Sequence, residues 1–313
     1  MKSVMHKGYG VHHNAIGVKD LKVMRPFYEK TLEFNQIFVD FPQAEYPALH
    51  EVVRAPHPVY IAPLLYQEAG GVIVELTQMV EPAGRPIRKD FRYGDIGQAK
   101  MTIAVGDIEK VYRELKGQVN FPFRPRRARI PDWGEYRFVY CRDPEGNLIE
   151  LASSEKLPVK HKYGGVQWVG VSVTNLERSL AFYQSYGGFD QVFMAPHESF
   201  SGLVDEVSGG KGTRVRSCVI GSRAGGGKLE LFEVLEPRGR SIPFATRWGD
   251  FGYLQVCLNG KQGDDIFQIA AYFEKEGIEF ASGPQLMHDE RQGAFFYMKD
   301  PDGVMVEFLN FLK

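Results

Sequence analysis

The chain has 313 residues, 43% of them hydrophobic, and a formal net charge of -1 at pH 7. This length and apolar content are enough for a sizeable buried core and suggest about two domains. The near-zero net charge gives no electrostatic reason to expect nucleic acid or an anionic membrane as the main partner.

The sequence shows neither a signal-peptide or membrane-span pattern nor a CxxC motif. Residues 1–10 lack the apolar stretch of a signal peptide, and no apolar run approaches the roughly 18 residues that a membrane span requires. We therefore expect a soluble, cytoplasmic protein. The three cysteines, Cys141, Cys218 and Cys257, lie in apolar strand-like segments without a CxxC spacing, which favours buried free thiols.

Four segments open in the same way, with a short alternating strand followed by a helix. In the first, Asp20 is the expected N-cap and Pro26 should bend the helix or delay its start. In the second, Asp107 is the expected N-cap and Gly117 should end the helix. The segments cover residues 12–34, 100–117, 168–188 and 255–277. After each helix come strand-like runs, so the predicted order is strand, helix and three strands, four times over.

Two stretches near the ends of the expected halves share an unusual pattern. Val139–Ser153 and Phe296–Asn310 each contain Asp-Pro-acid-Gly, which is typical of a type I turn. The alternation that follows places one glutamate, Glu150 or Glu307, among apolar neighbours. A carboxylate inside a core strand needs a partner or a metal ion, because an isolated buried charge is costly.

The chain contains an internal repeat. Glu81–Asp95 and Glu236–Asp250 agree at eight of fifteen positions without a gap, at an offset of 155 residues. The same offset carries Glu75 onto Glu230, so the agreement indicates duplication. We predict a first half at residues 1–152, a polar linker at 153–165 and a second half at 166–313.

This arrangement resembles the vicinal oxygen chelate superfamily, which includes glyoxalase I, methylmalonyl-CoA epimerase, extradiol dioxygenases and fosfomycin or bleomycin resistance proteins. The resemblance covers nearly the whole chain. It implies an α+β fold of four βαβββ modules, in two tandem halves that form two cup-shaped barrels. It also implies that metal ligands project inward from the first and last strands of each module.

Transfer of the family's ligand positions gives eight residues, of which Gln255 has the weakest spacing. The first-strand positions are His13, Lys100, Trp168 and Gln255, and the last-strand positions are Glu75, Glu150, Glu230 and Glu307. A lone histidine or a lone glutamate in a strand is more often not a metal ligand. Four glutamates at equivalent positions nevertheless favour a ligand role. Pairing modules within each half mixes ligands with lysine and tryptophan, which cannot coordinate a metal.

Pairing the outer modules together and the inner modules together separates the two kinds of residue. One cup then holds a predicted metal site, formed by His13, Glu75, Gln255 and Glu307. The other holds a predicted vestigial site, in which Lys100 stands between carboxylates: Lys100, Glu150, Trp168 and Glu230. The competing interpretation is a fold in which both sites have decayed.

For the metal site, the resemblance implies glyoxalase- or epimerase-type chemistry. A divalent ion (Zn, Ni, Co or Mn) would bind neighbouring oxygens of a small substrate while a glutamate moves a proton through an enediolate. Glu307 or Glu75 is the predicted base, and we favour Glu307. Gly17 and Met79 stand where glyoxalase I commonly has arginine and asparagine, which argues against glutathione. The aromatic stretches 247–253 and 294–298 suggest an apolar substrate, for which an aromatic ring is one option.

Two alternatives remain open. An extradiol-type ring-cleaving dioxygenase would use Fe(II), normally held by two histidines and one carboxylate, whereas here Gln255 replaces the second histidine. The second alternative is a non-catalytic protein that binds a small molecule, as resistance proteins do. The sequence leaves monomer and homodimer equally open.

Overall fold

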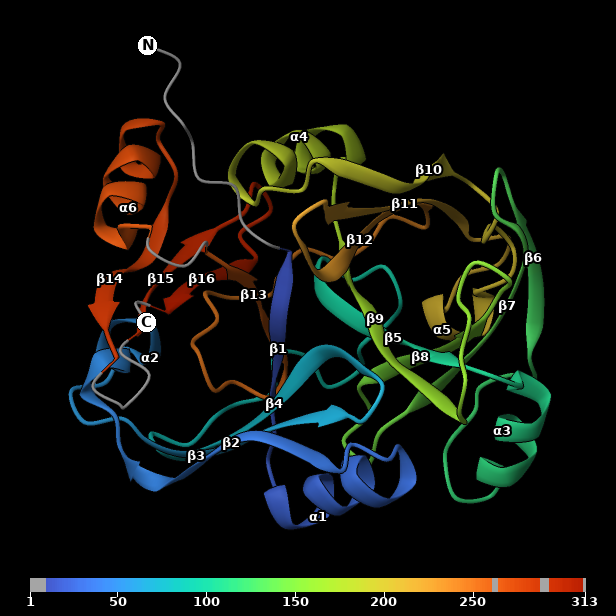
Figure 1. Cartoon of the computed structure of the whole chain (residues 1–313), viewed down its shortest axis with the longest axis horizontal. Helices are drawn as coiled ribbons and strands as arrows, with labels where there is room; N and C mark the ends of the chain where they lie inside the picture. The colour runs from blue at the N-terminus through green and yellow to red at the C-terminus, as the bar shows by residue number, and fades with distance from the viewer. Residues whose placement is uncertain (1–9, 261–263, 288–292, 312–313) are drawn as a thin grey trace.

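A computed structural model describes residues 10–260, 264–287 and 293–311 (Figure 1). The first module contains β1 (Val11–Gly17), α1 (Leu21–Pro26), the π-helical turn η1 (Phe27–Thr31), β2 (Gln36–Glu45), the 3-10 turn η2 (Pro47–Leu49), α2 (His50–Val53), β3 (Val59–Gln67) and β4 (Gly70–Glu81). The second contains β5 (Gly97–Val105), α3 (Ile108–Leu115), β6 (Arg126–Ile130), β7 (Gly134–Arg142) and β8 (Leu148–Ser153).

The second pair of modules repeats this order. The third module contains β9 (Tyr163–Ser172), α4 (Leu176–Tyr186), β10 (Gln191–His197), α5 (Asp205–Ser208), β11 (Arg214–Ser222) and β12 (Gly225–Glu236). The fourth contains β13 (Gly252–Asn259), α6 (Ile266–Lys275), β14 (Phe280–Leu286), β15 (Gly293–Lys299) and β16 (Met305–Phe311). The predicted α+β order is therefore confirmed, and the short helices α2 and α5, which begin 155 residues apart, are additions that the sequence pattern did not indicate.

The modules pair outer with outer and inner with inner. β1 runs antiparallel to β13, which joins the first module to the fourth, and β5 runs antiparallel to β9, which joins the second to the third. The outer cup has the strand order β2-β3-β4-β1-β13-β16-β15-β14, and the inner cup has the order β10-β11-β12-β9-β5-β8-β7-β6. These cups are the left and right lobes of Figure 1. This pairing is the one that the residue types predicted.

The two cups meet where glycine permits close backbone contact. Gly10 and Gly165, which are 155 residues apart, both have positive φ, at 80° and 81°. A Cβ atom on Gly10 would lie 2.6 Å from the Gly227 carbonyl oxygen, and one on Gly165 would lie 2.1 Å from the Gly70 carbonyl oxygen. Any larger residue would therefore force the cups apart at these two contacts.

The helix starts follow the predicted capping residues. Asp20 accepts a hydrogen bond from the Lys22 N–H, and Asp107 accepts one from the Lys110 N–H. Pro26 ends the regular α-helical turn, and the chain continues as the wider η1 turn, because proline has no N–H to donate to the helix ladder. Pro26 does not delay the helix start, which lies at Leu21, and its effect is the change from α1 to η1.

The repeated 15-residue stretch holds the two halves together. Arg240 donates to both carboxylate oxygens of Asp95, at 2.7 and 2.6 Å. The equivalent pair, Arg85 and Asp250, makes the reciprocal contact at 3.4 Å. Both aspartates are buried. Each ion pair joins an arginine of one half to an aspartate of the other, so the repeated stretch stabilises the junction of the cups.

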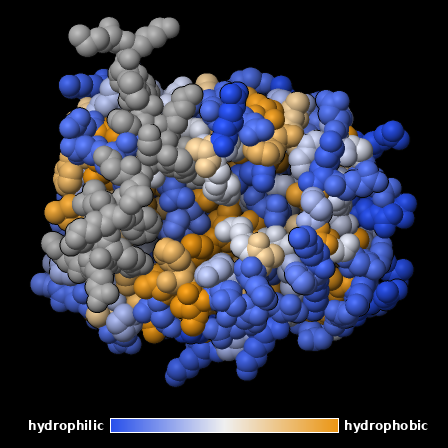
Figure 2. Space-filling model, viewed as in Figure 1, coloured by the Kyte–Doolittle hydropathy of each residue, from blue (hydrophilic) through white to orange (hydrophobic). Residues whose placement is uncertain are grey.

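Polar residues cover most of the face seen in Figure 2, and hydrophobic residues show in smaller patches. Across the described residues, none of the helices combines the length and the apolar character that crossing a membrane would need. One hydrophobic core runs through both cups, and a smaller apolar cluster that includes Tyr60 and Trp248 lines the outer cup.

Each Asp-Pro-acid-Gly turn is built on a buried aspartate. Asp143 accepts from the Glu145 and Asn147 N–H groups, and Asp300 accepts from the Asp302 and Val304 N–H groups. The i to i+3 hydrogen bonds expected of the turns join Gly146 to Asp143 and Gly303 to Asp300. Burial raises the pKa of Asp143 to about 6 and that of Asp300 to about 7.

These aspartates should make the folded state less stable as pH rises. Their folded-state pKa values exceed the unfolded values, so the native state binds the proton more tightly, and stability declines from about pH 4 to about pH 7. We compare the free energy of unfolding of Asp300→Asn with that of wild type at two pH values. The difference should favour the variant by roughly 2–4 kcal/mol more at pH 8 than at pH 4. Urea unfolding at the two pH values measures this, and Asp143→Asn should show a smaller gain. An equal difference at both pH values would contradict the prediction.

Candidate metal and substrate site

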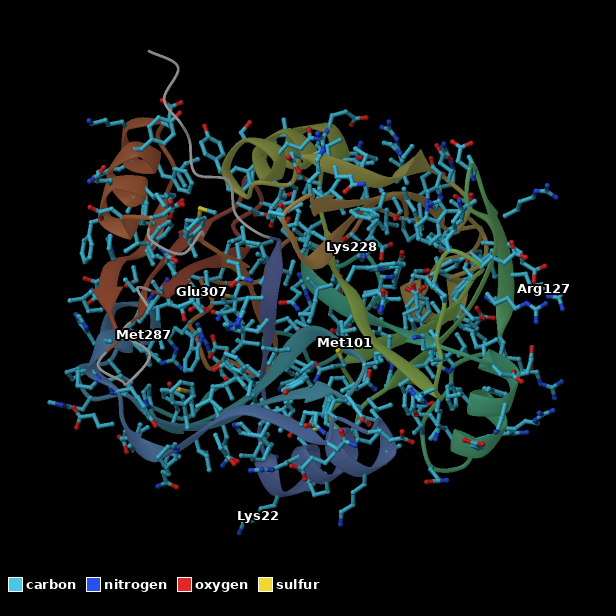
Figure 3. All side chains as sticks on the ribbon, in the orientation of Figure 1. Lys22, Met101, Arg127, Lys228, Met287 and Glu307 are labelled. Carbon is cyan, nitrogen blue, oxygen red and sulfur yellow. The ribbon has the colours of Figure 1, made fainter. Side chains whose placement is uncertain are left out.

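Four predicted ligand residues converge because their strands are neighbours. His13 lies on β1, Glu75 on β4, Gln255 on β13 and Glu307 on β16, and these strands follow one another in the order β4-β1-β13-β16. All four side chains are buried within the outer cup, where Figure 3 shows Glu307. The strand order thus brings together residues from the two ends of the chain.

One imidazole nitrogen faces both carboxylates. His13 Nε2 lies 3.3 Å from Glu75 Oε2 and 3.2 Å from Glu307 Oε2. Two ligand atoms at about 2.1 Å from a shared metal ion, in tetrahedral or octahedral geometry, would lie roughly 3.0–3.4 Å apart. The observed separations have the spacing of a ligand set.

Gln255 is the fourth residue of the predicted set. Its Nε2 donates to Glu307 Oε2 at 2.6 Å, whereas its Oε1 is buried and has no hydrogen-bond partner among the described residues. Amide oxygen is the atom with which glutamine would ligate a metal, and a buried unpaired carbonyl is costly. The donor set of one imidazole nitrogen, one amide oxygen and two carboxylates therefore fits a divalent cation.

The other imidazole nitrogen has its own partners. His13 Nδ1 lies 2.9 Å from His12 Nδ1, and the Cys257 thiol is near both rings. Burial alone would lower the pKa of His13, but the Glu307 carboxylate, together with hydrogen bonds to Cys257 and Glu307, outweighs burial and holds it well above its ordinary value. Burial raises the pKa of Cys257 to about 12, so the thiol stays protonated beside a charged imidazolium.

His12, His13 and Cys257 could also hold a metal ion, since their ligand atoms lie within 4.8 Å of one another. The two histidines approach each other through their Nδ1 atoms, whereas the carboxylates face His13 Nε2. We favour the carboxylate side, because Gln255 Oε1 has no hydrogen-bond partner within the described part of the chain, and a cation there would offset the repulsion between Glu75 and Glu307. With Nε2 on the metal, His13 Nδ1–H would donate to His12 Nδ1, and this hydrogen bond would orient the His13 ring, as outer partners of ligating histidines do.

The site opens into a cavity of about 710 Å³. Its walls are rich in aromatic residues, with Tyr60 against Tyr46 and Trp248 at ring-centroid distances of 4.1 and 4.9 Å. Phe41 and Phe295 also line it. Volume and lining are those of a small-molecule site with an apolar wall and a few polar groups at one end.

The inner cup brings together the other four predicted residues. Lys100 lies on β5, Glu150 on β8, Trp168 on β9 and Glu230 on β12. Lys100 Nζ forms ion pairs with Glu150 Oε2 and, at 2.7 Å, with Glu230 Oε2. The ammonium thus stands between the two carboxylates, at the place equivalent to the predicted metal site of the outer cup.

Further donors satisfy the inner carboxylates. Tyr136 and Tyr140 donate to Glu150 at 2.8 and 3.0 Å, and Ser217 donates to Glu230 at 2.8 Å. Burial, reinforced by Glu150, raises the pKa of both tyrosines well above the ordinary value, so the phenols remain donors. All of these groups are buried.

Trp168 occupies the part of the inner cup that corresponds to His13. Its ring is 1% exposed and packs against Tyr136 and Trp133, at centroid distances of 6.5 and 6.2 Å. Aromatic side chains therefore fill the space around the ion pairs, whereas the outer cup has an open cavity at the equivalent place.

The fold and the buried polar residues that face into the outer cup define a protein of paired βαβββ modules with a candidate site inside a cup. The family profile described as "Glyoxalase/Bleomycin resistance protein/Dioxygenase superfamily" matches residues 10–151 and 165–308. The chain belongs to this superfamily. Among the curated proteins, none matches the chain.

Solved structures with a similar fold cover nearly the whole chain. Glyoxalase I from Zea mays has a TM-score of 0.63 at 16% identity, covering 96% of this chain and 92% of that one. A putative dioxygenase from Bacillus subtilis has a TM-score of 0.61 at 13% identity, covering 98% and 87%. At these identities the likeness establishes the fold alone.

Sequence reasoning missed the residues that surround the ligand set. His12 was visible as one of two adjacent histidines, but strand alternation sends neighbours to opposite faces and gave no reason to place both near one site. Cys257 was expected as an inert buried thiol, and it is buried but contacts the His13 ring. Tyr297, which lies opposite Glu307 on β15, carried no signal beyond its aromatic stretch.

Proposed function

We propose that the protein is a metal-dependent enzyme of the glyoxalase or epimerase kind, acting on a small apolar substrate with neighbouring oxygens. The observation that carries this proposal is the convergence of Glu75 and Glu307 on His13 Nε2, together with a Gln255 Oε1 that has no hydrogen-bond partner among the described residues. His13, Glu75, Gln255 and Glu307 would hold the ion. Zinc, nickel, cobalt and manganese all suit such ligands.

The bound metal would polarise two neighbouring substrate oxygens as a Lewis acid. Glu307 is the proposed base, which takes a proton from the carbon beside one oxygen and returns it to the adjacent carbon. Gln255 supports this role because its amide fixes one oxygen of Glu307 at 2.6 Å and so orients the carboxylate. A positioned carboxylate of this kind contributes about 100- to 10,000-fold to proton transfer.

The cavity supports an apolar, ring-containing substrate. Tyr60 and Trp248 form an edge-to-face pair beside the site, and such surfaces accept planar rings. Met79 is packed into the core with them and offers no hydrogen bond to a peptide-like substrate. These contacts favour an aromatic ketone or aldehyde over a charged peptide.

A second candidate is a ring-cleaving dioxygenase that uses Fe(II). His12 favours it, because a second imidazole lines the cavity next to His13, and two histidines with one carboxylate are the usual ligands of such iron sites. It is the weaker candidate, since His12 reaches His13 Nδ1 rather than the nitrogen that faces the carboxylates.

Hydrogen exchange distinguishes the candidates. With 2-hydroxyacetophenone in D₂O, NMR should show metal-dependent loss of the signal from the carbon-bound protons next to the carbonyl. We expect Glu307→Gln to slow this exchange by about 100-fold or more, while Glu135→Gln, an exposed change on β7, leaves it unaltered.

Three outcomes would argue against proton transfer. Oxygen uptake with a catechol after anaerobic loading with Fe(II) would favour the dioxygenase. Tight binding of an aromatic ligand that a chelator does not weaken would favour a non-catalytic binding protein. Absence of stoichiometric metal after supplementation, measured by elemental analysis, would count against both enzymes.

A further inference from the structure

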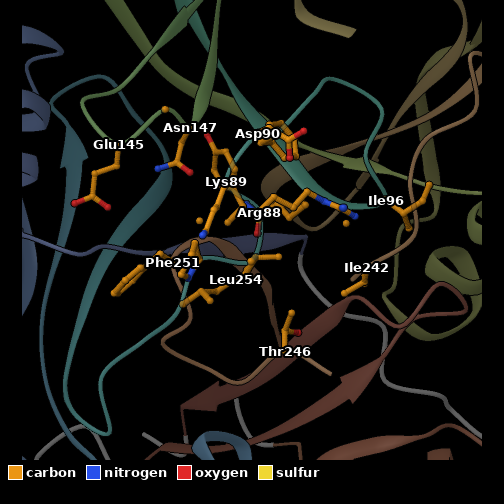
Figure 4. Close-up of a pocket in the computed structure, with 18 of the residues that line it drawn as sticks. Arg88, Lys89, Asp90, Ile96, Glu145, Asn147, Ile242, Thr246, Phe251 and Leu254 are labelled. Atoms are coloured by element: carbon orange, nitrogen blue, oxygen red, sulfur yellow. The ribbon is translucent and has the colours of Figure 1, made fainter. Parts of the chain in front are cut away.

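A second cavity, of about 700 Å³, lies where the two cups meet (Figure 4). It shares no lining residue with the outer-cup cavity, so the proposed enzymatic reaction does not account for it. Both halves of the chain contribute apolar residues to its lining, among them Ile96, Ile242, Phe251 and Leu254, which Figure 4 labels. The cavity is therefore suited in size and lining to a small apolar molecule.

Several charged groups of the lining already have partners. Asp90 forms an ion pair with Arg240 at 2.8 Å. Glu145 accepts two backbone N–H groups at the start of the first helix, at 2.9 and 3.0 Å. Arg88 lies 3.6 Å from the buried carboxylate of Asp95. Both carboxylates of the lining are therefore engaged, and the charge of Arg88 is matched by an acid.

Arg142, which also lines the cavity, has no ion-pair partner within the described residues. Its guanidinium donates only to carbonyl oxygens, those of Gly146 at 2.6 Å and Phe91 at 3.4 Å. The neighbouring Asp143 is occupied within its own turn, where Asn147 donates to both carboxylate oxygens. Arg142 is only partly buried, and its Nε, which has no hydrogen-bond partner in the described part of the chain, keeps accessible surface. A ligand in the cavity can therefore reach the guanidinium.

The equivalent cation of the second half does have an acid beside it. The offset of 157 residues between the two Asp-Pro turns carries Arg142 onto Lys299. The Arg142 N–H donates to the Asn120 carbonyl at 3.0 Å, and the Lys299 N–H donates in the same way to the Glu279 carbonyl at 2.8 Å. The Lys299 ammonium also forms an ion pair with the Glu279 side chain. Asn120 is neutral, so the first half provides no such acid for Arg142.

The charge of Arg142 is incompletely compensated. Burial lowers the pKa of the guanidinium more than Asp143 raises it. An anion beside the guanidinium would stabilise its charged form, and a carboxylate matches the fork of N–H donors that arginine presents. Lys19 and Lys89, which lie exposed at the cavity lining, add to the positive potential. These charges favour an anionic occupant.

We propose that this cavity is a second binding site, for an apolar molecule that carries one carboxylate. The carboxylate accepts hydrogen bonds from Arg142 and so supplies the negative charge that Glu279 provides for Lys299 in the second half. The apolar body of the ligand contacts the hydrophobic lining, which includes Phe251 and Leu254. One partly buried cation beside an apolar space is the feature that selects this class of ligand.

The test uses 2-naphthoate as the probe and 2-naphthamide, which has the same shape without the charge, as its matched control. Titrations followed by methyl NMR should shift Ile87 and Ile96, which line this cavity. Signals of Leu64 and Leu309 report separately on the outer cup. At Ile87 and Ile96 we expect 2-naphthoate to bind about tenfold or more tightly than 2-naphthamide, because charge-assisted hydrogen bonds are about twice as strong as neutral ones.

Two variants assign the preference to Arg142. Arg142→Gln removes the charge and should erase the preference for 2-naphthoate, whereas Lys299→Gln, the matched change in the second half, should leave it unaltered. Asn120→Glu places an acid beside Arg142, as Glu279 lies beside Lys299, and should also erase the preference. Asn120 is exposed, so this variant decides the question if Arg142→Gln does not fold.

Three results would overturn the proposal. The first is failure of 2-naphthoate at millimolar concentration to shift Ile87 and Ile96 in the wild-type protein. The second is equal affinity of the wild-type protein for 2-naphthoate and 2-naphthamide. The third is a preference for 2-naphthoate that persists in folded Arg142→Gln, or in Asn120→Glu where Arg142→Gln does not fold.

Discussion

His13→Ala is expected to lower the affinity for a divalent metal ion by more than about 100-fold, beyond the usual effect of losing an outer-shell partner of a ligand. The imidazole supplies the only nitrogen in the proposed set, and its Nε2 lies within 3.3 Å of both carboxylates. Competition with a chromophoric chelator for cobalt or zinc measures the change. Circular dichroism of the metal-free variant establishes that it still folds.

Two matched variants locate the metal. Trp168→Phe changes the inner-cup residue equivalent to His13 and should leave the metal stoichiometry unaltered. Cys257→Ala should also retain the metal if the ion lies on the carboxylate side of His13. Loss of metal in Cys257→Ala, with retention in Glu75→Gln, would instead assign the ion to the cluster of His12, His13 and Cys257.

Lys100→Met is expected to destabilise the fold by about 3–5 kcal/mol, the usual cost of breaking a buried ion pair. Burial alone would lower the pKa of Lys100, but Glu150 and Glu230 outweigh burial and raise it, so the ammonium is charged in the native state. Without it, two buried carboxylates face each other with only hydroxyl donors. Urea unfolding measures the loss.

The pH dependence of this variant provides a separate check. Without the ammonium, the two carboxylates favour the protonated form, so the loss of stability should be smaller at pH 5 than at pH 8. The double change Lys100→Met with Glu230→Gln should recover part of the stability, because one uncompensated charge is removed. Metal affinity should be that of wild type. If Lys100→Met abolished metal binding while His13→Ala did not, the two cups would be assigned the wrong way round.

The pairing of modules was predictable because residue types constrained it. His13 and Gln255 can coordinate a metal whereas Lys100 and Trp168 cannot, so only one way of joining the modules produced a complete ligand set. The structure has that pairing, although the ligand roles themselves remain predictions. The division into halves at residues 153–165 also remains a proposal, since each cup takes strands from both halves.

The sequence by itself determined the modules, their order and the inward carboxylates. These depend on local signals: alternation, the caps Asp20 and Asp107, and turns built on Asp143 and Asp300. Only the tertiary structure decided what surrounds each carboxylate. Whether Glu307 faces an open cavity and Glu150 a sealed cluster depends on side chains from strands far apart in the chain. Such contacts arise from packing between elements, and no local sequence pattern encodes them.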